Sequence, residues 1–227
     1  MEYNNVIGKL KSLKDPEAVK GMARFGINPK NNFGISVTKL REYAKEIGKD
    51  HNLALKLWGS GIRDARMLAV HIDDPKLVTE EQLEKWVYDF NSWDVCDNCC
   101  MHLFYKTQFV YEKIVEWSKC EQEFVKRAGF TLIASLSIHD KKSNDKIFEE
   151  FLQIIKREST DERNYVKKAI NWALRQIGKK NRNLNIKAIK IARGIRKIDS
   201  KSARWIATNA IKELTDEKVK YRLNKKD

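Results

Sequence analysis

The chain has 227 residues, of which 42% are apolar and 33% are charged. This composition is too apolar for a disordered chain, and 10 glycines with 3 prolines are too few for a sandwich of many short strands. Lys and Arg number 45 against 31 Asp and Glu, a net charge of +14 that favours an acidic polymer or surface as the partner.

The N-terminus predicts neither export nor insertion into a membrane. It reads MEYNN, without a charged segment followed by an apolar one, and no run of about 18 apolar residues occurs in the chain. We therefore expect a cytoplasmic protein that does not enter a membrane.

The longest irregular stretch is the loop of residues 25–35, FGINPKNNFGI, which contains Pro29 and two glycines. It either contacts a ligand or only connects two helices. Elsewhere the apolar residues recur at intervals of three and four, which predicts about twelve helices of roughly 8 to 18 residues. We expect these helices to begin at capping residues such as Thr79, Ser92, Asp161 and Ser200.

The segment SWDVCDNCC, residues 92–100, places an aromatic ring next to a carboxylate. Trp93 and Asp97 are four residues apart and share one side of a helix. Spacing alone favours an ordinary structural role for both. Cys96 and Cys99 form a C-x-x-C pair, but no second ligand pair follows at a fixed distance, so we expect small buried thiols and no metal site.

The predicted helix of residues 161–178 has its apolar side chains on one face, which leaves Lys167, Lys168 and Arg175 off that face. It belongs to a strongly basic region. Residues 1–140 hold 20 Lys and Arg and 20 Asp and Glu, whereas residues 141–227 hold 25 basic and 11 acidic residues. This asymmetry favours nucleic acid as partner over a merely solvated surface.

A weak repeat places basic residues just before an alanine in four apolar helices, at residues 62–70, 123–133, 164–174 and 202–214. Repeats of this length bury their apolar faces by stacking on their neighbours. The sequence thus predicts an all-α chain, an α-solenoid superhelix in a single domain over residues 1–227. Its basic residues would tend to line the concave surface, which could hold a duplex.

Five motifs in order resemble the DNA alkylation repair glycosylase family, a superhelix of HEAT-like repeats. They are MARFGI, FGISVTKLREYAKEIGKD with LALKLWGSGIRDARMLA, SWDVCDNC, FVKRAGF and YVKKAINWALRQIGKK, which together cover nearly the whole chain. The resemblance implies a protein that binds duplex DNA and removes N3- and N7-alkylated purines. The sequence shows no sign of an oligomer, so we expect a monomer, and the mechanism requires no cofactor or metal ion.

Carried over residue by residue, the resemblance makes Asp97 the catalytic carboxylate, with Trp93, Trp172 and Arg127 contacting the DNA. Asp97 would stabilise the positively charged sugar. The candidate phosphate contacts are the neighbouring basic residues Lys126, Lys167, Lys168, Arg175, Lys179, Lys180, Arg204 and Lys212.

Two other classes of function stay open at this stage. The chain could be a non-catalytic HEAT-like module that binds duplex nucleic acid by shape and charge, or a solenoid that binds an acidic protein. The pairing of Trp93 with Asp97 favours the enzyme, because binding phosphates requires no carboxylate on the binding face.

Overall fold

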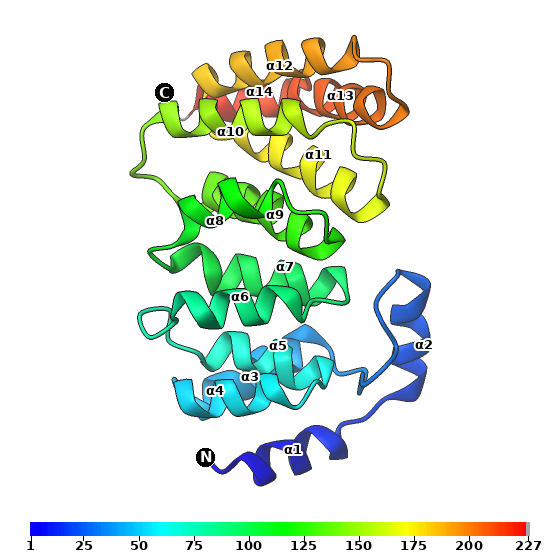
Figure 1. Ribbon diagram of the computed structural model, residues 1–227, viewed down its shortest axis with the longest axis vertical. Coiled ribbons are helices and arrows are strands. Elements are labelled where there is room, and N and C mark those ends of the chain that lie inside the picture. Colours follow the sequence, from blue (N-terminus) through cyan, green and yellow to red (C-terminus); the bar gives the residue numbers. More distant parts are fainter. Residues whose placement is uncertain (226–227) are drawn as a thin grey trace. The chain divides into compact units, whose positions relative to one another are not determined.

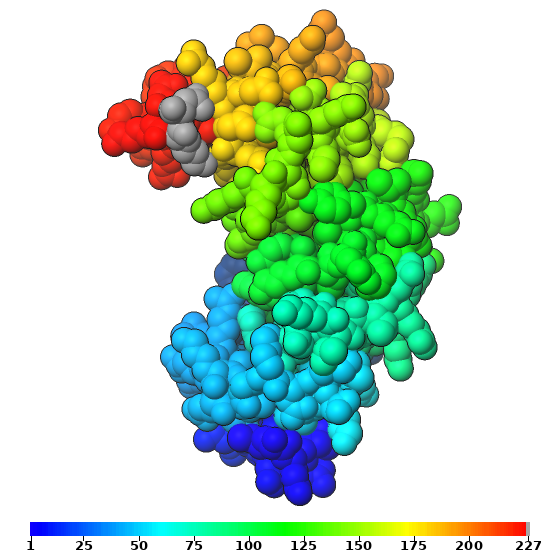
Figure 2. Space-filling view, turned by 90° about the vertical axis from the view of Figure 1, so that its left-hand side faces the viewer, coloured from blue at the N-terminus to red at the C-terminus, as the bar shows by residue number. Residues whose placement is uncertain are grey.

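The chain folds into helices, as Figure 1 shows for a computed structural model that describes residues 1–225. No strand occurs within these residues, which confirms the all-α prediction. The helices belong to two compact units, Met1–Val110 and Tyr111–Asp227. Figure 2 shows the surface of both units, the first coloured from blue to green and the second from green to red.

The N-terminal unit is organised around α5, which packs against α3, α4 and α7. Its core includes the stacked rings of Trp58 and Trp86, whose centroids lie 3.9 Å apart. The helices are α1 (Tyr3–Ser12), α2 (Pro16–Arg24), α3 (Val37–Ile47), α4 (His51–Gly59), α5 (Arg63–Ile72), α6 (Glu80–Tyr88) and α7 (Trp93–His102), followed by the 3-10 helix η1 (Phe104–Lys106).

The C-terminal unit is built in two layers, with α11 packed between α9 and α13 in one layer and α10 beside α12 in the other. Helix α11 has the apolar face that its sequence predicts, since Val166, Ala169 and Ile170 are fully buried. The helices are α8 (Val110–Trp117), α9 (Glu123–His139), α10 (Asp145–Arg157), α11 (Asn164–Gly178), α12 (Arg182–Arg196), α13 (Lys201–Leu214) and α14 (Glu217–Asn224).

The described residues contain fourteen α-helices, two more than expected. Part of the difference arises because Pro16 occupies the first position of α2 and Asp15 caps it, so that a three-residue turn separates α1 from α2. The predicted caps Thr79 and Ser200 accept hydrogen bonds from the first turns of α6 and α13.

The prediction that Asp161 begins a helix is wrong. Helix α11 begins at Asn164, and the carboxylate of Asp161 instead accepts hydrogen bonds from Arg163 and forms an ion pair with Lys126. Asp161 also accepts from the backbone N–H of Arg163, so its carboxylate orders the turn before α11 and does not cap the first turn of the helix.

Candidate functional site

Trp93 and Asp97 lie one turn apart near the start of α7, and both side chains are partly exposed. Trp93 is the first residue of the helix. The residues between them, Asp94 to Cys96, are buried. The accessible side of this part of α7 therefore presents an aromatic ring together with a carboxylate, as the spacing in the sequence predicts.

A buried network of charges fixes the start of α7. Arg63, at the start of α5, donates from Nε to Asp94 Oδ2 at 2.7 Å and from Nη1 to Asp64 Oδ1 at 3.0 Å. Ser92 donates to the other oxygen of Asp94. Because Arg63 is only 6% exposed, these bonds are shielded from water and hold α7 firmly against α5.

The irregular loop of residues 25–35 is anchored beside α7. Trp93 donates from Nε1 to the backbone oxygen of Phe25 at 3.0 Å, and the backbone N–H of Asn28 donates to Ser92. Asp64 accepts from the backbone N–H groups of Phe33 and Ile35. Phe25 is 77% exposed, so the loop adds a second accessible aromatic residue whose backbone contacts Trp93.

The cysteines of α7 face the interior. Cys96, Cys99 and Cys100 are buried free thiols, as predicted, and burial raises the pKa of Cys99 and Cys100 well above the usual range for a thiol. No group of three or more His, Cys, Asp or Glu side chains suited to a metal ion occurs within residues 1–225.

In the C-terminal unit, Arg127 and Lys126 stand in the first turns of α9 and are largely buried. Arg127 donates from Nη1 to the backbone oxygen of Tyr165, at the start of α11, at 2.6 Å. Lys126 forms ion pairs with Glu158 at 2.7 Å and Asp161 at 3.2 Å. These pairs argue against Lys126 as a phosphate contact, since its ammonium already joins α9 to the segment before α11.

Helix α11 carries Trp172, which is partly exposed. Its indole Nε1 lies 3.0 Å from the amide oxygen of Gln176 in the orientation that satisfies both groups. Lys168 is exposed and Lys167 is partly exposed, whereas Arg175 is engaged by Glu213 of α13. The structure therefore brings Trp172 and the basic residues of α11 together within one unit, and Trp93 with Asp97 within the other.

Sequence reasoning missed Trp205, an exposed aromatic residue of α13. Its side chain is 38% exposed, and the Lys167 ammonium lies 5.6 Å from its ring centroid. The signal was present in the repeat pattern, because Ala203, Ile206 and Ala207 form the buried face of α13 and leave Trp205 off it.

Three of the remaining predicted phosphate contacts have a partner within the protein. Lys179 pairs with Glu213, Arg204 pairs with Asp199, and Lys180 donates to the backbone oxygen of Asp140. The pKa of Glu213 lies below its usual value. Burial raises this pKa, but the hydrogen bonds and charges of Lys179 and Arg175 together lower it by more. Lys212 is exposed.

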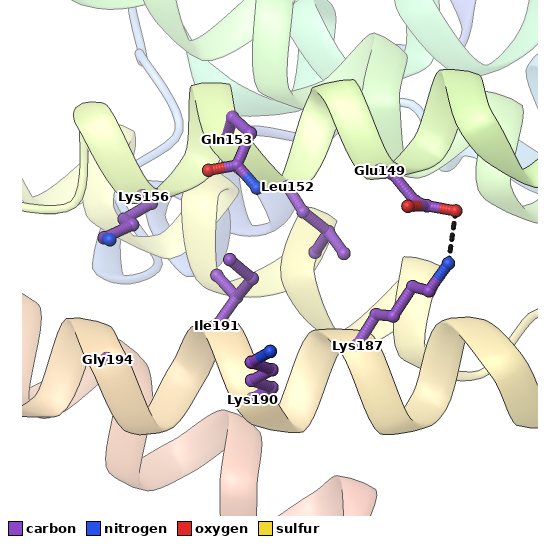
Figure 3. A pocket seen from close by; sticks show the side chains of 8 residues that line it. All are labelled: Glu149, Leu152, Gln153, Lys156, Lys187, Lys190, Ile191 and Gly194. Atoms are coloured by element: carbon purple, nitrogen blue, oxygen red, sulfur yellow. Dashed lines mark hydrogen bonds and ion pairs between the residues drawn. The ribbon is translucent and has the colours of Figure 1, made fainter.

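Positive charge also gathers on the second layer of the C-terminal unit. A groove of about 430 Å³ lies between α10 and α12. Lys156, Lys187 and Lys190 are among the side chains that line it (Figure 3). Glu149 pairs with Lys187. Residues 182–197 contain six Lys and Arg and no Asp or Glu. The basic residues therefore occupy both layers, and the net charge of residues 141–227 does not by itself select a binding surface.

The fold and these two groups of side chains define a helical protein whose accessible sites combine aromatic rings, one carboxylate and many cations. The chain belongs to the DNA alkylation repair enzyme family, whose model it matches over residues 6–214.

A solved structure with the same HEAT-like fold aligns with a TM-score of 0.82 at 21% identity and covers 98% of this chain and 96% of the other. It is described as a new family of proteins related to the HEAT-like repeat DNA glycosylases with affinity for branched DNA structures. The uncharacterized protein Lin0241 of Listeria innocua is 23% identical over 200 residues, which are 86% of this chain and 87% of that protein. No helix within residues 1–225 is both long and apolar enough to cross a membrane.

Proposed function

We propose that this protein is a DNA glycosylase that removes N3- and N7-alkylated purines from duplex DNA, with Asp97 as its catalytic carboxylate. The observation that carries the proposal is the pair of Trp93 and Asp97 on the accessible side of α7, in a chain of the DNA alkylation repair enzyme family. Arg63 supports this role because it fixes the helix that presents the carboxylate.

The chemistry requires little of the protein. An N3- or N7-alkylated purine is already cationic and leaves readily, so that positive charge develops on the deoxyribose in an oxocarbenium-like state. A carboxylate near the sugar stabilises that charge and can orient the attacking water. No general acid is needed, because the leaving base is neutral once the bond has broken.

The aromatic and basic residues hold the DNA. Trp93, one turn from Asp97, offers its ring face to the cationic base or sugar, a contact of roughly 0.5 to 2 kcal/mol. Trp172 offers an aromatic ring to the DNA from the C-terminal unit. Lys167 and Lys168, which are accessible on α11, bind backbone phosphates through charge-assisted bonds. Arg127 is largely buried, and it supports them by joining α9 to the start of α11 through its bond to Tyr165. With about six phosphate contacts, DNA affinity should fall about a thousandfold between 50 and 200 mM salt.

The test measures release of 7-methylguanine and 3-methyladenine from methylated duplex DNA by mass spectrometry. We expect Asp97→Asn to lower the rate about a hundredfold or more while DNA binding persists. Glu81→Gln is the matched control, because Glu81 is an exposed carboxylate of α6 in the same unit. Equal rates for the wild type and Asp97→Asn would refute the role of Asp97.

A second candidate is a non-catalytic protein that binds branched DNA, which is favoured by the description of the solved structure with the same fold. This candidate predicts no base release above the spontaneous rate. It also predicts tighter binding to a four-way junction than to a linear duplex of equal length. Base release together with equal affinity for both DNA forms would exclude it.

A further inference from the structure

A pocket of about 410 Å³ lies in the N-terminal unit where α3, α5 and α7 end. We call it the His71 pocket, and its lining residues are Arg41, Ala44, Lys45, Gly48, Lys49, His71 and His102. No Asp or Glu is among them. A region whose overall charge is close to zero thus concentrates positive charge at one point.

Three cations of the pocket follow one side of α3 and its C-terminal end, because Arg41, Lys45 and Lys49 are spaced four residues apart. All three are exposed, and within residues 1–225 none of them pairs with a carboxylate. Arg41 donates from Nη2 to His102 Nε2 at 2.8 Å, so among the described residues its side-chain partner is an imidazole. Lys45 has no hydrogen-bond or ion-pair partner among these residues.

The two histidines add hydrogen-bonding groups. Their ring centroids are 4.9 Å apart. The Nε2 atom of His71 is buried and has no hydrogen-bond partner within the described residues. Burial, together with the charges of His102 and Arg41, lowers the pKa of His71 to about 4. At neutral pH this ring is therefore uncharged, and the positive charge of the pocket comes from Arg41, Lys45 and Lys49.

Attraction to the C-terminal ends of helices accounts for the position of Lys49 but not for those of Arg41 and Lys45. The carbonyl groups at the end of a helix carry partial negative charge and attract cations. Lys49 uses this attraction by donating to the backbone oxygens of His71 and Asp73. The Asp73 carboxylate is bound by His51 and Gln82 and does not neutralise the pocket. Arg41 and Lys45 form no ion pair within the described residues, and the carboxylates of Glu42 and Glu46 on the same helix do not line the pocket.

We propose that the His71 pocket binds a phosphate group. A phosphate would compensate Arg41 and Lys45 and accept hydrogen bonds from both of them, beside the wall that His71 and His102 form. The pocket has room for a group attached to the phosphate, so the source is either the DNA backbone or a small phosphorylated molecule. The inference that the phosphate belongs to DNA rests on the proposed function, whereas the inference that the pocket binds a phosphate does not.

The first experiment titrates sodium phosphate into the isotope-labelled protein and follows the imidazole resonances of His71 and His102 by NMR, with sodium chloride at matched ionic strength as the reference. We expect saturable shifts with phosphate alone. We also expect the pKa of His71 to rise by about one unit, because a bound anion favours the protonated ring. Equal responses to phosphate and chloride would overturn the proposal.

Two double variants distinguish binding in the pocket from attraction to the overall positive charge. Arg41→Ala/Lys45→Ala should weaken phosphate binding about tenfold or more, because it removes two charged donors that are exposed to water. Lys9→Ala/Lys85→Ala removes the same charge from exposed sites of the same unit and should bind phosphate as the wild type does. Lys45→Gln alone serves if the double variant fails to fold. Unchanged phosphate affinity in a folded Arg41 and Lys45 variant would refute the assignment.

A DNA-binding measurement identifies the source. If the phosphate belongs to the DNA backbone, Arg41→Ala/Lys45→Ala weakens duplex binding. The slope of log affinity against log salt concentration then becomes shallower by about two, which corresponds to two lost phosphate contacts. If duplex binding is unchanged while phosphate binding is lost, the ligand is a small phosphorylated molecule. Neither outcome depends on base release, so failure of the glycosylase proposal would be seen separately, in the Asp97→Asn assay.

Discussion

Replacing Arg63 with methionine should destabilise the N-terminal unit by about 3 to 5 kcal/mol. The guanidinium is 6% exposed and bonds to two carboxylates, Asp94 at 2.7 Å and Asp64 at 3.0 Å. Removing it leaves both carboxylates buried without their cation, and removing one partner from a buried ion pair costs about that much. Asp64 keeps two backbone N–H donors and Asp94 keeps Ser92, so the larger figure is an upper limit.

The assay combines urea unfolding followed by tryptophan fluorescence with hydrogen exchange of residues 63–102. Arg24→Met is the control, because Arg24 is exposed on α2 and its loss should change stability by less than about 0.5 kcal/mol. We also expect faster exchange at the start of α7 and slower base release in Arg63→Met, since Trp93 and Asp97 lose their support.

A double-mutant cycle tests whether the bond between Arg63 and Asp94 holds α7 in place. Arg63→Met combined with Asp94→Asn should cost about 1 to 3 kcal/mol less than the two single variants added together, because the second substitution removes the carboxylate that the first leaves unpaired. Additive costs, or a loss below about 1 kcal/mol in Arg63→Met, would show that the network does not hold α7 in place.

Three further predictions concern stability and DNA binding. The pKa of His71 falls to about 4 on folding, so the unfolded chain binds more protons below about pH 6.5. Acidification to pH 4 should therefore cost about 1 to 2 kcal/mol after discounting for the exposed part of the ring, and urea unfolding of His71→Gln should show a flatter pH dependence. Gly129→Ala should lower stability by about 1 to 3 kcal/mol in urea unfolding, since the added Cβ would lie 2.9 Å from the backbone nitrogen of Ser118, whereas Gly8→Ala meets nothing within 4 Å and should be neutral or stabilising. Trp205→Ala should weaken DNA binding about fivefold in fluorescence anisotropy by removing the ring beside Lys167, and an unchanged affinity would exclude Trp205 from the interface.

The sequence by itself determined the features that depend on neighbours along the chain. Helical periodicity identified the buried face of α11, the spacing of Trp93 and Asp97 placed them on one side of α7, and Thr79 and Ser200 marked helix starts. These predictions succeed because hydrogen bonds within a helix and its caps join residues three or four apart.

Tertiary structure alone decided the contacts between distant segments. Arg63 and Asp94 are 31 residues apart, and nothing in the local pattern pairs them. The sequence predicts Lys126 as a phosphate contact, whereas in the structure its ammonium forms ion pairs with Glu158 and Asp161. The His71 pocket gathers its cations from segments that the charge count averages to zero. A net charge sums residues wherever they lie, whereas a binding site depends on which of them the packing of helices brings together and leaves without a partner.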